Sequence, residues 1–276
     1  MSAEQSIGVF DSGIGGLTVV KELFSRVPHE RIVYFGDTAR VPYGSKSVET
    51  VRRYAREDTE LLLRHHPKLI VVACNTVSAV ALDVVKSLAN GIPVIGMIEP
   101  ACKEAIRVSA SGKIGIIGTD ATISSKAYET ELRNEAKRMG KEIETFAKAC
   151  PLFVPLAEEG WEEKIVAELV AREYLHSLHE AKVDTLILGC THYPVLSHVI
   201  QTVMGAGVTL INSGAIAAQE VKILEGDAGA KRSDHVFFVS DIPRKFQSLG
   251  ERFLGRELPT VKQVTYEEAW VIEHDS

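Results

Sequence analysis

The sequence predicts an α/β fold of two similar domains with mainly parallel sheets, related by pseudo-symmetry. Two observations indicate it: short β-branched runs alternate with longer helical patterns from end to end, and one strand–cysteine pattern occurs twice. Strands that alternate with helices form parallel sheets covered on both faces. The chain has 276 residues, 45% of them hydrophobic, which is enough to bury sizeable cores without disulfides or metal ions.

Eight apolar runs are predicted as strands because each is short, β-branched and bounded by turn or helix signals. In chain order they are residues 7–10, 32–36, 69–73, 94–98, 114–118, 185–189, 209–211 and 236–239. The continuous apolar run at residues 69–72 is typical of a strand buried on both faces.

Between the strands, apolar residues recur at the three- and four-residue spacing of amphipathic helices. One stripe comprises Val77, Val80, Ala81, Val84, Val85 and Leu88. A second stripe contains Trp161, Ile165, Leu169 and Val170. We expect one helix at each stripe.

Two segments follow one plan. Residues 68–76 form an apolar strand that ends in Cys74 and two polar residues before a helix, and residues 184–192 repeat this pattern around Cys190, 116 positions later. A shorter echo of residues 8–12 lies at residues 115–119. We therefore expect two domains related by an approximate internal symmetry, dividing near Glu99 and Pro100.

Composition excludes several classes of protein. The net charge is −6 and basic residues are spread through the chain, so no nucleic-acid footprint is expected. The polar N-terminus lacks the apolar stretch of a signal peptide, and no apolar run approaches the roughly 20 residues that span a bilayer. We expect a cytoplasmic protein with no membrane partner, whose four cysteines are free thiols.

Cys74 and Cys190 are the candidate catalytic residues. Both follow a strand, and ligands of open α/β sheets bind at the carboxyl ends of strands. A helix N-terminus there would stabilise a thiolate and lower the thiol pKa, which suits proton transfer near neutral pH. The alternative is that both simply pack beneath helices. Cys102 and Cys150 lack this setting and are expected in the core or a loop; the paired spacing of a zinc site is absent.

The residues after the first strand suggest a small-ligand site. Asp11 and Ser12 precede Gly13-Ile14-Gly15-Gly16, but Thr18 stands where a dinucleotide motif needs glycine. Glycine here allows a tight turn and a close approach to a small ligand. Asp11 either caps a helix, tunes a thiol or holds an ammonium group.

Three further positions have two interpretations each. The loop Val41-Pro42-Tyr43-Gly44-Ser45 either binds a carboxylate through hydroxyls and amides or is a simple turn. His192 either assists Cys190 as a proton partner or caps and packs. Glu158 is either a site residue or a solvated glutamate ahead of the next helix.

These motifs together resemble the glutamate racemases of the aspartate/glutamate racemase superfamily. The resemblance runs through nearly the whole chain and rests on residues 9–16, residues 34–37 with 42–44, residues 73–76 and residues 188–194. It implies that the chain returns to the first domain near Ser213. The first domain is then residues 1–99 with 214–276, the second is residues 100–213, and the active site lies in the cleft between them.

The resemblance also implies roles for individual residues. Cys74 and Cys190 would exchange protons with glutamate, assisted by Asp11, His192 and Glu158, with no cofactor and no metal. The residues that would bind the amino acid are Asp11, Ser12, Tyr43, Gly44, Asn75, Thr76, Thr191 and His192. Family members often have valine where this chain has Ala157, so the segment around Glu158 matches the family pattern only in part. The implied product, D-glutamate, serves peptidoglycan synthesis, and the family is commonly dimeric.

Two rival functions stay open at this point. An aspartate or hydantoin racemase would have the same fold and thiols, and only the family pattern of Thr191-His192-Tyr193-Pro194 favours glutamate. A binding or regulatory protein would keep the fold without the chemistry, but binding alone needs no facing thiols. Incorporation of solvent deuterium at the α-carbon separates an enzyme from a binder.

Overall fold

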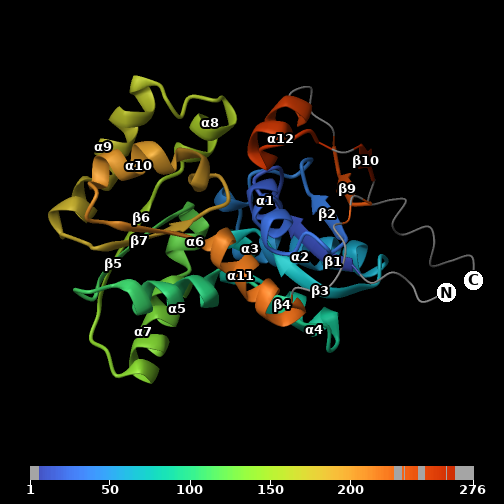
Figure 1. The fold of residues 1–276 in the computed structure, drawn as a ribbon, viewed down its shortest axis with the longest axis horizontal. Helices are drawn as coiled ribbons and strands as arrows, with labels where there is room; N and C mark the ends of the chain where they lie inside the picture. Colours follow the sequence, from blue (N-terminus) through green and yellow to red (C-terminus); the bar gives the residue numbers. More distant parts are fainter. Residues whose placement is uncertain (1–5, 227–231, 233, 242–245, 259, 265–276) are drawn as a thin grey trace, which may run out of the picture.

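The computed structural model describes residues 6–226, 232, 234–241, 246–258 and 260–264, and it contains two parallel sheets that lie side by side (Figure 1). The first sheet has the order β10-β9-β2-β1-β3-β4 and the second β6-β5-β7-β8. All pairings between described strands are parallel. The predicted fold class, two α/β domains with mainly parallel sheets, is confirmed.

The strands of the first sheet come from both ends of the chain: β1 (Ser6–Asp11), β2 (Ile32–Gly36), β3 (Pro67–Val72), β4 (Val94–Ile95), β9 (Val236–Val239) and β10 (Val261–Gln263). Those of the second sheet are consecutive: β5 (Lys113–Gly118), β6 (Glu144–Ala149), β7 (Thr185–Gly189) and β8 (Thr209–Asn212). This division of strands agrees with the expected domains, whose boundaries at 99/100 and 213/214 stay a prediction.

Helices cover the sheets and fill the junction between them, where α11 lies (Figure 1). They are α1 (Leu17–Arg26), α2 (Val48–Leu63), α3 (Asn75–Val80), α4 (Leu82–Ala89), α5 (Ile98–Val108), α6 (Asp120–Ser124), α7 (Ala127–Met139), α8 (Phe153–Glu158), α9 (Ile165–Glu180), α10 (Ser197–Met204), α11 (Ser213–Glu225) and α12 (Phe246–Leu254), with short 3₁₀ helices η1 (Tyr43–Ser45) and η2 (Tyr193–Leu196). In the described part of the chain, none of these helices has the length and apolar character required to cross a membrane.

Two strands next to the site are fully buried. Every residue of β1 and β7 is buried. Side-chain caps then start two of the helices that follow strands: Thr119 accepts from the Thr122 amide at α6, and Asn212 accepts from the amides of Gly214 and Ala215 at α11. Such caps satisfy amides that have no intrahelical partner.

The strand predictions need three corrections. The predicted strand 94–98 is wrong beyond Ile95, because α5 begins at Ile98. Two strands were not predicted: β6, whose side chains are only partly buried or exposed, and β10, which has three residues. Both lie at sheet edges, where the continuous apolar signal of a central strand is absent.

The helix predictions need two corrections. The first stripe belongs to two helices, α3 and α4, because Ala81 leaves helical geometry at φ −143° and ψ 8°. In the second stripe Trp161 precedes α9, and Ile165 and Leu169 are exposed, at 69% and 59%. The side chains that α9 buries are Ala167, Ala171, Leu175 and Leu178.

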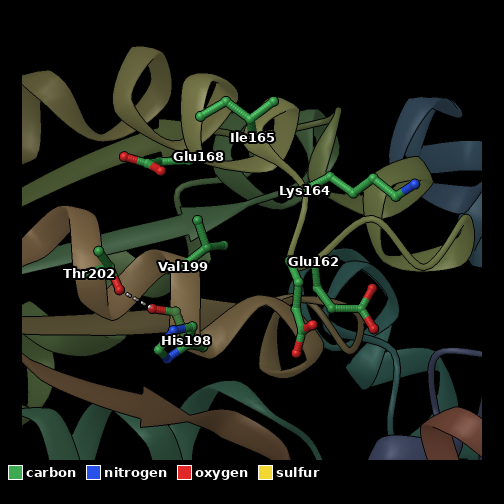
Figure 2. Close-up of a pocket in the computed structure, with 8 residues that line it drawn as sticks. Glu162, Lys164, Ile165, Glu168, His198, Val199 and Thr202 are labelled. Carbon is green, nitrogen blue, oxygen red and sulfur yellow. Dashed lines mark hydrogen bonds between the residues drawn. The ribbon is translucent and has the colours of Figure 1, made fainter.

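The exposed side of α9 borders a hollow against α10, shown in Figure 2. Its lining is mixed in character and comprises Glu162, Glu163, Lys164, Ile165, Glu168, His198, Val199 and Thr202. None of these residues is a predicted site residue. This hollow is separate from the cleft that contains the two candidate cysteines.

Candidate active site

A cleft lies at the carboxyl ends of strands from both sheets. It contains both candidate cysteines, and all but one of the predicted site residues line it: Ser12, Tyr43, Gly44, Cys74, Asn75, Thr76, Glu158, Cys190, Thr191 and His192. The exception, Asp11, is buried at the end of β1 beside Ser12. The parallel strand order brings these distant segments to one place, as open α/β sheets do.

Cys74 follows β3 and stands at the N-cap position of α3. It is only 4% exposed, and its thiol donates to the Ser12 hydroxyl at 3.6 Å. Burial, followed by the charge of Asp11, raises the pKa of the thiol to about 12, although the Val77 amide and Ser12 lower it. The predicted lowering of the pKa by the helix N-terminus is therefore wrong for Cys74, because desolvation exceeds the stabilisation by the amides.

Cys190 follows β7 and has a different neighbourhood. No α-helix begins directly after it; η2 starts three residues later and α10 follows at Ser197. Its sulfur lies 3.9 Å from Nδ1 of His192, and Nε2 of His192 lies 2.9 Å from a carboxylate oxygen of Glu158. Cys190, His192 and Glu158 therefore form a continuous line of polar contacts.

The pKa of His192 is shifted strongly. Burial lowers the pKa of the imidazole, but the hydrogen bonds to Cys190 and Glu158 outweigh burial and raise the pKa to about 10. The ring is thus positively charged at neutral pH, and its Nδ1 faces the sulfur of Cys190.

Asp11 holds the glycine loop and retains one unused oxygen. Its Oδ1 accepts from the amides of Gly13 and Gly16 at 3.1 and 3.0 Å, ahead of α1. Its Oδ2 is buried and has no hydrogen-bond partner among the residues that the structure describes. Burial raises the pKa of this carboxyl, against the effects of His192 and the loop amides. The capping and the thiol-tuning interpretations of Asp11 are therefore compatible.

Asn75 and Thr76 present polar groups to the cleft from the start of α3. The Asn75 Oδ1 accepts from the Tyr128 hydroxyl at 2.6 Å, which fixes the orientation of its amide, and the buried Nδ2 has no partner within the described residues. The Thr76 hydroxyl lies 3.0 Å from that of Thr119, across the cleft from the second sheet. A buried donor without a partner is costly unless a ligand accepts from it.

Glycine at two positions lets loops of the two sheets approach each other. A Cβ at Gly15 would lie 2.2 Å from the Thr191 hydroxyl oxygen and 2.6 Å from Nδ1 of His192. A Cβ at Gly44 would lie 2.5 Å from that of Thr119. The sequence predicted that the first glycine loop closely approaches a ligand. In the structure, Gly15 of this loop closely approaches the loop that contains Thr191 and His192.

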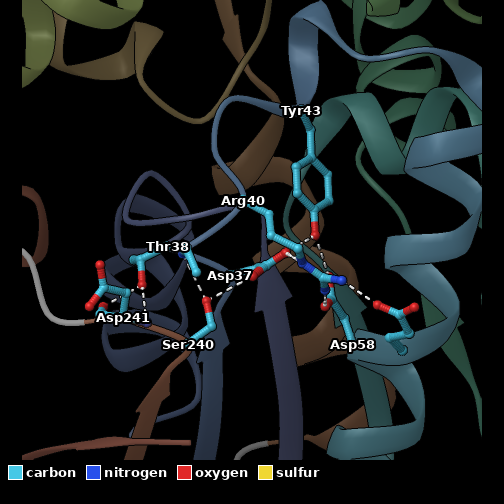
Figure 3. A network of polar contacts seen from close by, with 9 residues as sticks. Asp37, Thr38, Arg40, Tyr43, Asp58, Ser240 and Asp241 are labelled. Atoms are coloured by element: carbon cyan, nitrogen blue, oxygen red, sulfur yellow. Dashed lines mark hydrogen bonds and ion pairs between the residues drawn. The ribbon is translucent and has the colours of Figure 1, made fainter. Parts of the chain in front are cut away.

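The hydroxyl of Tyr43 faces away from the cleft into the polar network of Figure 3. It donates to Asp58 at 2.9 Å and also contacts Asp37. Arg40 binds the same two carboxylates, at 2.5 and 2.9 Å. Protein carboxylates therefore hold this hydroxyl, and Tyr43 lines the cleft through its other atoms.

Thr119 is a cleft residue that was not predicted. It follows β5 as Ser12 follows β1, and it occupies the place of Ser12 in the echo at residues 115–119. That echo was the signal that could have identified it. Val154 of α8 also lines the cleft, but no sequence pattern marks it.

Cys102 and Cys150 are buried, as predicted, and neither lines the cleft. Among the residues that the structure describes, no group of three or more His, Cys, Asp or Glu side chains is arranged to hold a metal ion. The titratable groups that line the cleft include the thiols of Cys74 and Cys190, the Glu158 carboxyl and the His192 imidazole, and the Asp11 carboxyl is buried beside Ser12.

Comparison with known proteins identifies the family. The model of the Asp/Glu/Hydantoin racemase family matches residues 7–221. The chain is 52% identical to the glutamate racemase of Chlorobaculum tepidum, over 96% of this chain and 97% of that protein, and 50% identical to that of Geobacter metallireducens, over 95% and 97%. Its structure matches the glutamate racemase of Francisella tularensis in complex with D-glutamate with a TM-score of 0.88 at 40% identity, covering 96% and 99% of the two chains. The chain therefore belongs to the glutamate racemases, within the Asp/Glu/Hydantoin racemase family.

Proposed function

We propose that this protein interconverts L-glutamate and D-glutamate without a cofactor, by proton transfer between the substrate α-carbon and two thiols, Cys74 and Cys190. Racemisation removes the α-hydrogen from one face of the carbon and returns a proton to the other. Two opposed groups suit this task better than one. The observation that carries the proposal is that both cysteines, from equivalent strand ends of two sheets, line one cleft.

The two thiols have different neighbours. A pKa of about 12 keeps the Cys74 thiol protonated at neutral pH, ready to donate. Cys190 has the imidazole of His192 as its neighbour, held in turn by Glu158, and is the proposed base. In the reverse direction Cys74 must lose its proton, and the proposed acceptor is the Asp11 carboxylate, whose Oδ2 has no partner among the described residues.

Fixed donors lower the barrier of a very weakly acidic α-proton. They act by stabilising the carbanion-like transition state through the substrate carboxylate. Asn75, whose Nδ2 has no partner among the described residues, is the foremost donor. The remaining groups proposed to contact the amino acid are Asp11, Ser12, Tyr43, Gly44, Thr76, Thr191 and His192.

The wider role follows from the same resemblance. We propose that the protein is a cytoplasmic homodimer that supplies D-glutamate for peptidoglycan synthesis. Ile165 and Leu169, one helical turn apart on α9, leave apolar surface that supports an association with a second copy. Sedimentation of the purified protein at micromolar concentration tests this point: a monomer would reject the dimer.

Circular dichroism of the substrate tests the proposed reaction. Purified, reduced protein is incubated with L-glutamate in the presence of a metal chelator and without added cofactor, and L-aspartate serves as the comparison substrate. We expect the glutamate signal to decay to zero, and the aspartate signal to decay at least roughly 100-fold more slowly, as a site built around one substrate length discriminates. A stable glutamate signal, or equal rates for both substrates, contradicts the proposal.

A further inference from the structure

Helix α12 contacts His192 and Glu158, the other two members of the line of polar contacts that begins at Cys190, although α12 belongs to the chain segment that covers the first sheet. The Arg252 guanidinium donates to the backbone carbonyls of Ala157 and Glu158, the latter at 3.1 Å. The adjacent Phe253 is buried, and its ring meets the His192 ring edge-on, with centroids 5.4 Å apart at 84°.

The Arg252 contacts lie at the C-terminal end of α8. Glu158 is the last residue of α8, and the final carbonyls of a helix lack intrahelical partners and favour a nearby cation. Gly160, at φ +70°, leaves space for the guanidinium, since a Cβ there would lie 2.3 Å from Nη1 of Arg252. The carboxylate of Glu158 leaves this fixed turn and reaches Nε2 of His192 at 2.9 Å.

We propose that Arg252 is a positioning residue: together with Phe253 it fixes the Glu158–His192 pair, and through that pair it sets the reactivity of Cys190. This inference rests on the proposed role of Cys190 in proton transfer. It also makes a helix of one domain part of the proton-transfer machinery of the other.

Three variants test the proposal in the full-length protein. Arg252→Met removes the donors and keeps the aliphatic stem, Arg252→Lys keeps a cationic donor, and Arg256→Met removes an exposed arginine four residues further along, which stacks on Phe24 instead. We expect Arg252→Met to lower kcat for glutamate roughly tenfold or more with little change in KM, because small displacements of a catalytic group cost large factors in rate. Arg252→Lys should recover part of this loss, and Arg256→Met should leave kcat unchanged.

Isotope effects with α-deuterated L- and D-glutamate separate positioning from simple loss of folded protein. Cys190 abstracts the α-proton of only one enantiomer. In Arg252→Met we therefore expect the substrate isotope effect to rise for that enantiomer alone. A merely structural role would lower the rate with both enantiomers and change neither isotope effect, and that result would overturn the inference.

A pair of glycine variants tests the same contact from the α8 side. Gly160→Ala places a Cβ against Arg252, whereas Gly140→Ala introduces the same left-handed backbone strain, at φ +64°, where nothing lies within 4 Å. We expect Gly160→Ala to reproduce the asymmetric isotope effect and Gly140→Ala to match the wild type. Equal behaviour of the two variants rejects the proposal.

NMR titration of the imidazole tests the geometry independently of catalysis. Glu158, Cys190 and Asp11 are titratable groups that face His192, and the Arg252 variants leave all three in place. We expect the pKa of His192 to fall in Arg252→Met and to be unchanged in Arg256→Met. If the wild-type protein fails to racemise glutamate, the proposed function fails, and this titration still decides whether Arg252 positions Glu158. An unchanged pKa in Arg252→Met contradicts the inference.

Discussion

Cys74 and Cys190 are equally buried, but different charges surround them. Burial and then the charge of Asp11 raise the pKa of Cys74, whereas the sulfur of Cys190 lies 3.9 Å from Nδ1 of the charged His192. The two residues therefore share a sequence pattern and differ in their electrostatics. The pattern in the sequence predicted where they lie; the sign of the pKa shift at Cys74 depends on burial and on Asp11, which a strand pattern does not report.

The four cysteines give an internal comparison. We expect Cys74→Ala and Cys190→Ala each to lower kcat by at least about 10³-fold, since a missing acid or base removes a catalytic step. Cys102→Ala and Cys150→Ala remove equally buried thiols outside the cleft and should change kcat less than about threefold. Steady-state racemisation with thermal melting of all four variants checks this. A Cys102→Ala variant that is fully folded but slow would contradict the assignment of the chemistry to Cys74 and Cys190.

His192 makes the free energy of unfolding depend on pH in the alkaline range. Its pKa is about 10 in the folded protein against an ordinary value near 6.5 in an unfolded chain, so between these values the folded state holds a proton that the unfolded state lacks. The stability it contributes is complete below pH 6.5 and is lost as the pH rises through 10, by up to about 1.4 kcal/mol per pH unit. Urea unfolding from pH 6 to 9.5 measures this slope.

Glu158→Gln should weaken that pH dependence, because the carboxylate is one of the partners that raise the pKa of His192. Glu163→Gln removes an exposed carboxylate from the hollow beside α9 and serves as the control. Identical slopes in the wild type and Glu158→Gln would mean that the Glu158–His192 pair does not hold the proton.

At the scale of elements, the strands that position the site were predictable and the helix faces less so. Strands β1, β3 and β7 lie inside their sheets and each contains a continuous apolar run, so their sequences identify them regardless of context. The stripe at Ile165 and Leu169 has helical spacing, but α9 packs through its alanines and through Leu175, because small side chains allow closer contact with the sheet. Spacing identifies a helix; which of two apolar faces is buried depends on what lies opposite.

Two leucines of α9 test this assignment. Leu169 is 59% exposed and Leu175 is fully buried. We expect Leu169→Ala to change the free energy of unfolding by less than about 0.5 kcal/mol and Leu175→Ala to lower it by roughly 2–5 kcal/mol. Chemical denaturation of both variants measures the difference. A larger loss at Leu169 would show that the exposed side of α9 is covered in solution, as a dimer interface would be.

For the whole molecule, the cleft depends on contacts between the two sheets. Gly15 against Thr191 and Gly44 against Thr119 bring the loops together, and Arg252 joins α12 to α8. The glycines were visible in the sequence, but the partners of these contacts were not, because they are brought together only by the relative placement of the two sheets. The same holds for the network that binds the Tyr43 hydroxyl.

The close packing of the Gly15 and Thr191 loops can be tested by a substitution at Gly15. In Gly15→Ala the new methyl group would overlap the Thr191 hydroxyl and displace His192, so we expect kcat to fall by roughly 10²-fold and stability by about 1–3 kcal/mol. Gly207→Ala, where nothing lies within 4 Å, is the control and should retain full activity. Wild-type kinetics in Gly15→Ala would contradict the close approach of the two loops.

The position of solvent deuterium in early turnover tests the two-thiol mechanism most directly. The protein converts L-glutamate in D₂O to a few per cent, and the α-deuterium of the D-glutamate formed and of the L-glutamate remaining is measured by NMR. Two opposed thiols predict deuterium in the product while the remaining substrate stays almost unlabelled, because the donating thiol has exchanged with solvent and the abstracting thiol faces the other side. Product that retains the original α-hydrogen, or equal labelling of both enantiomers from the start, would indicate a single base and contradict the account.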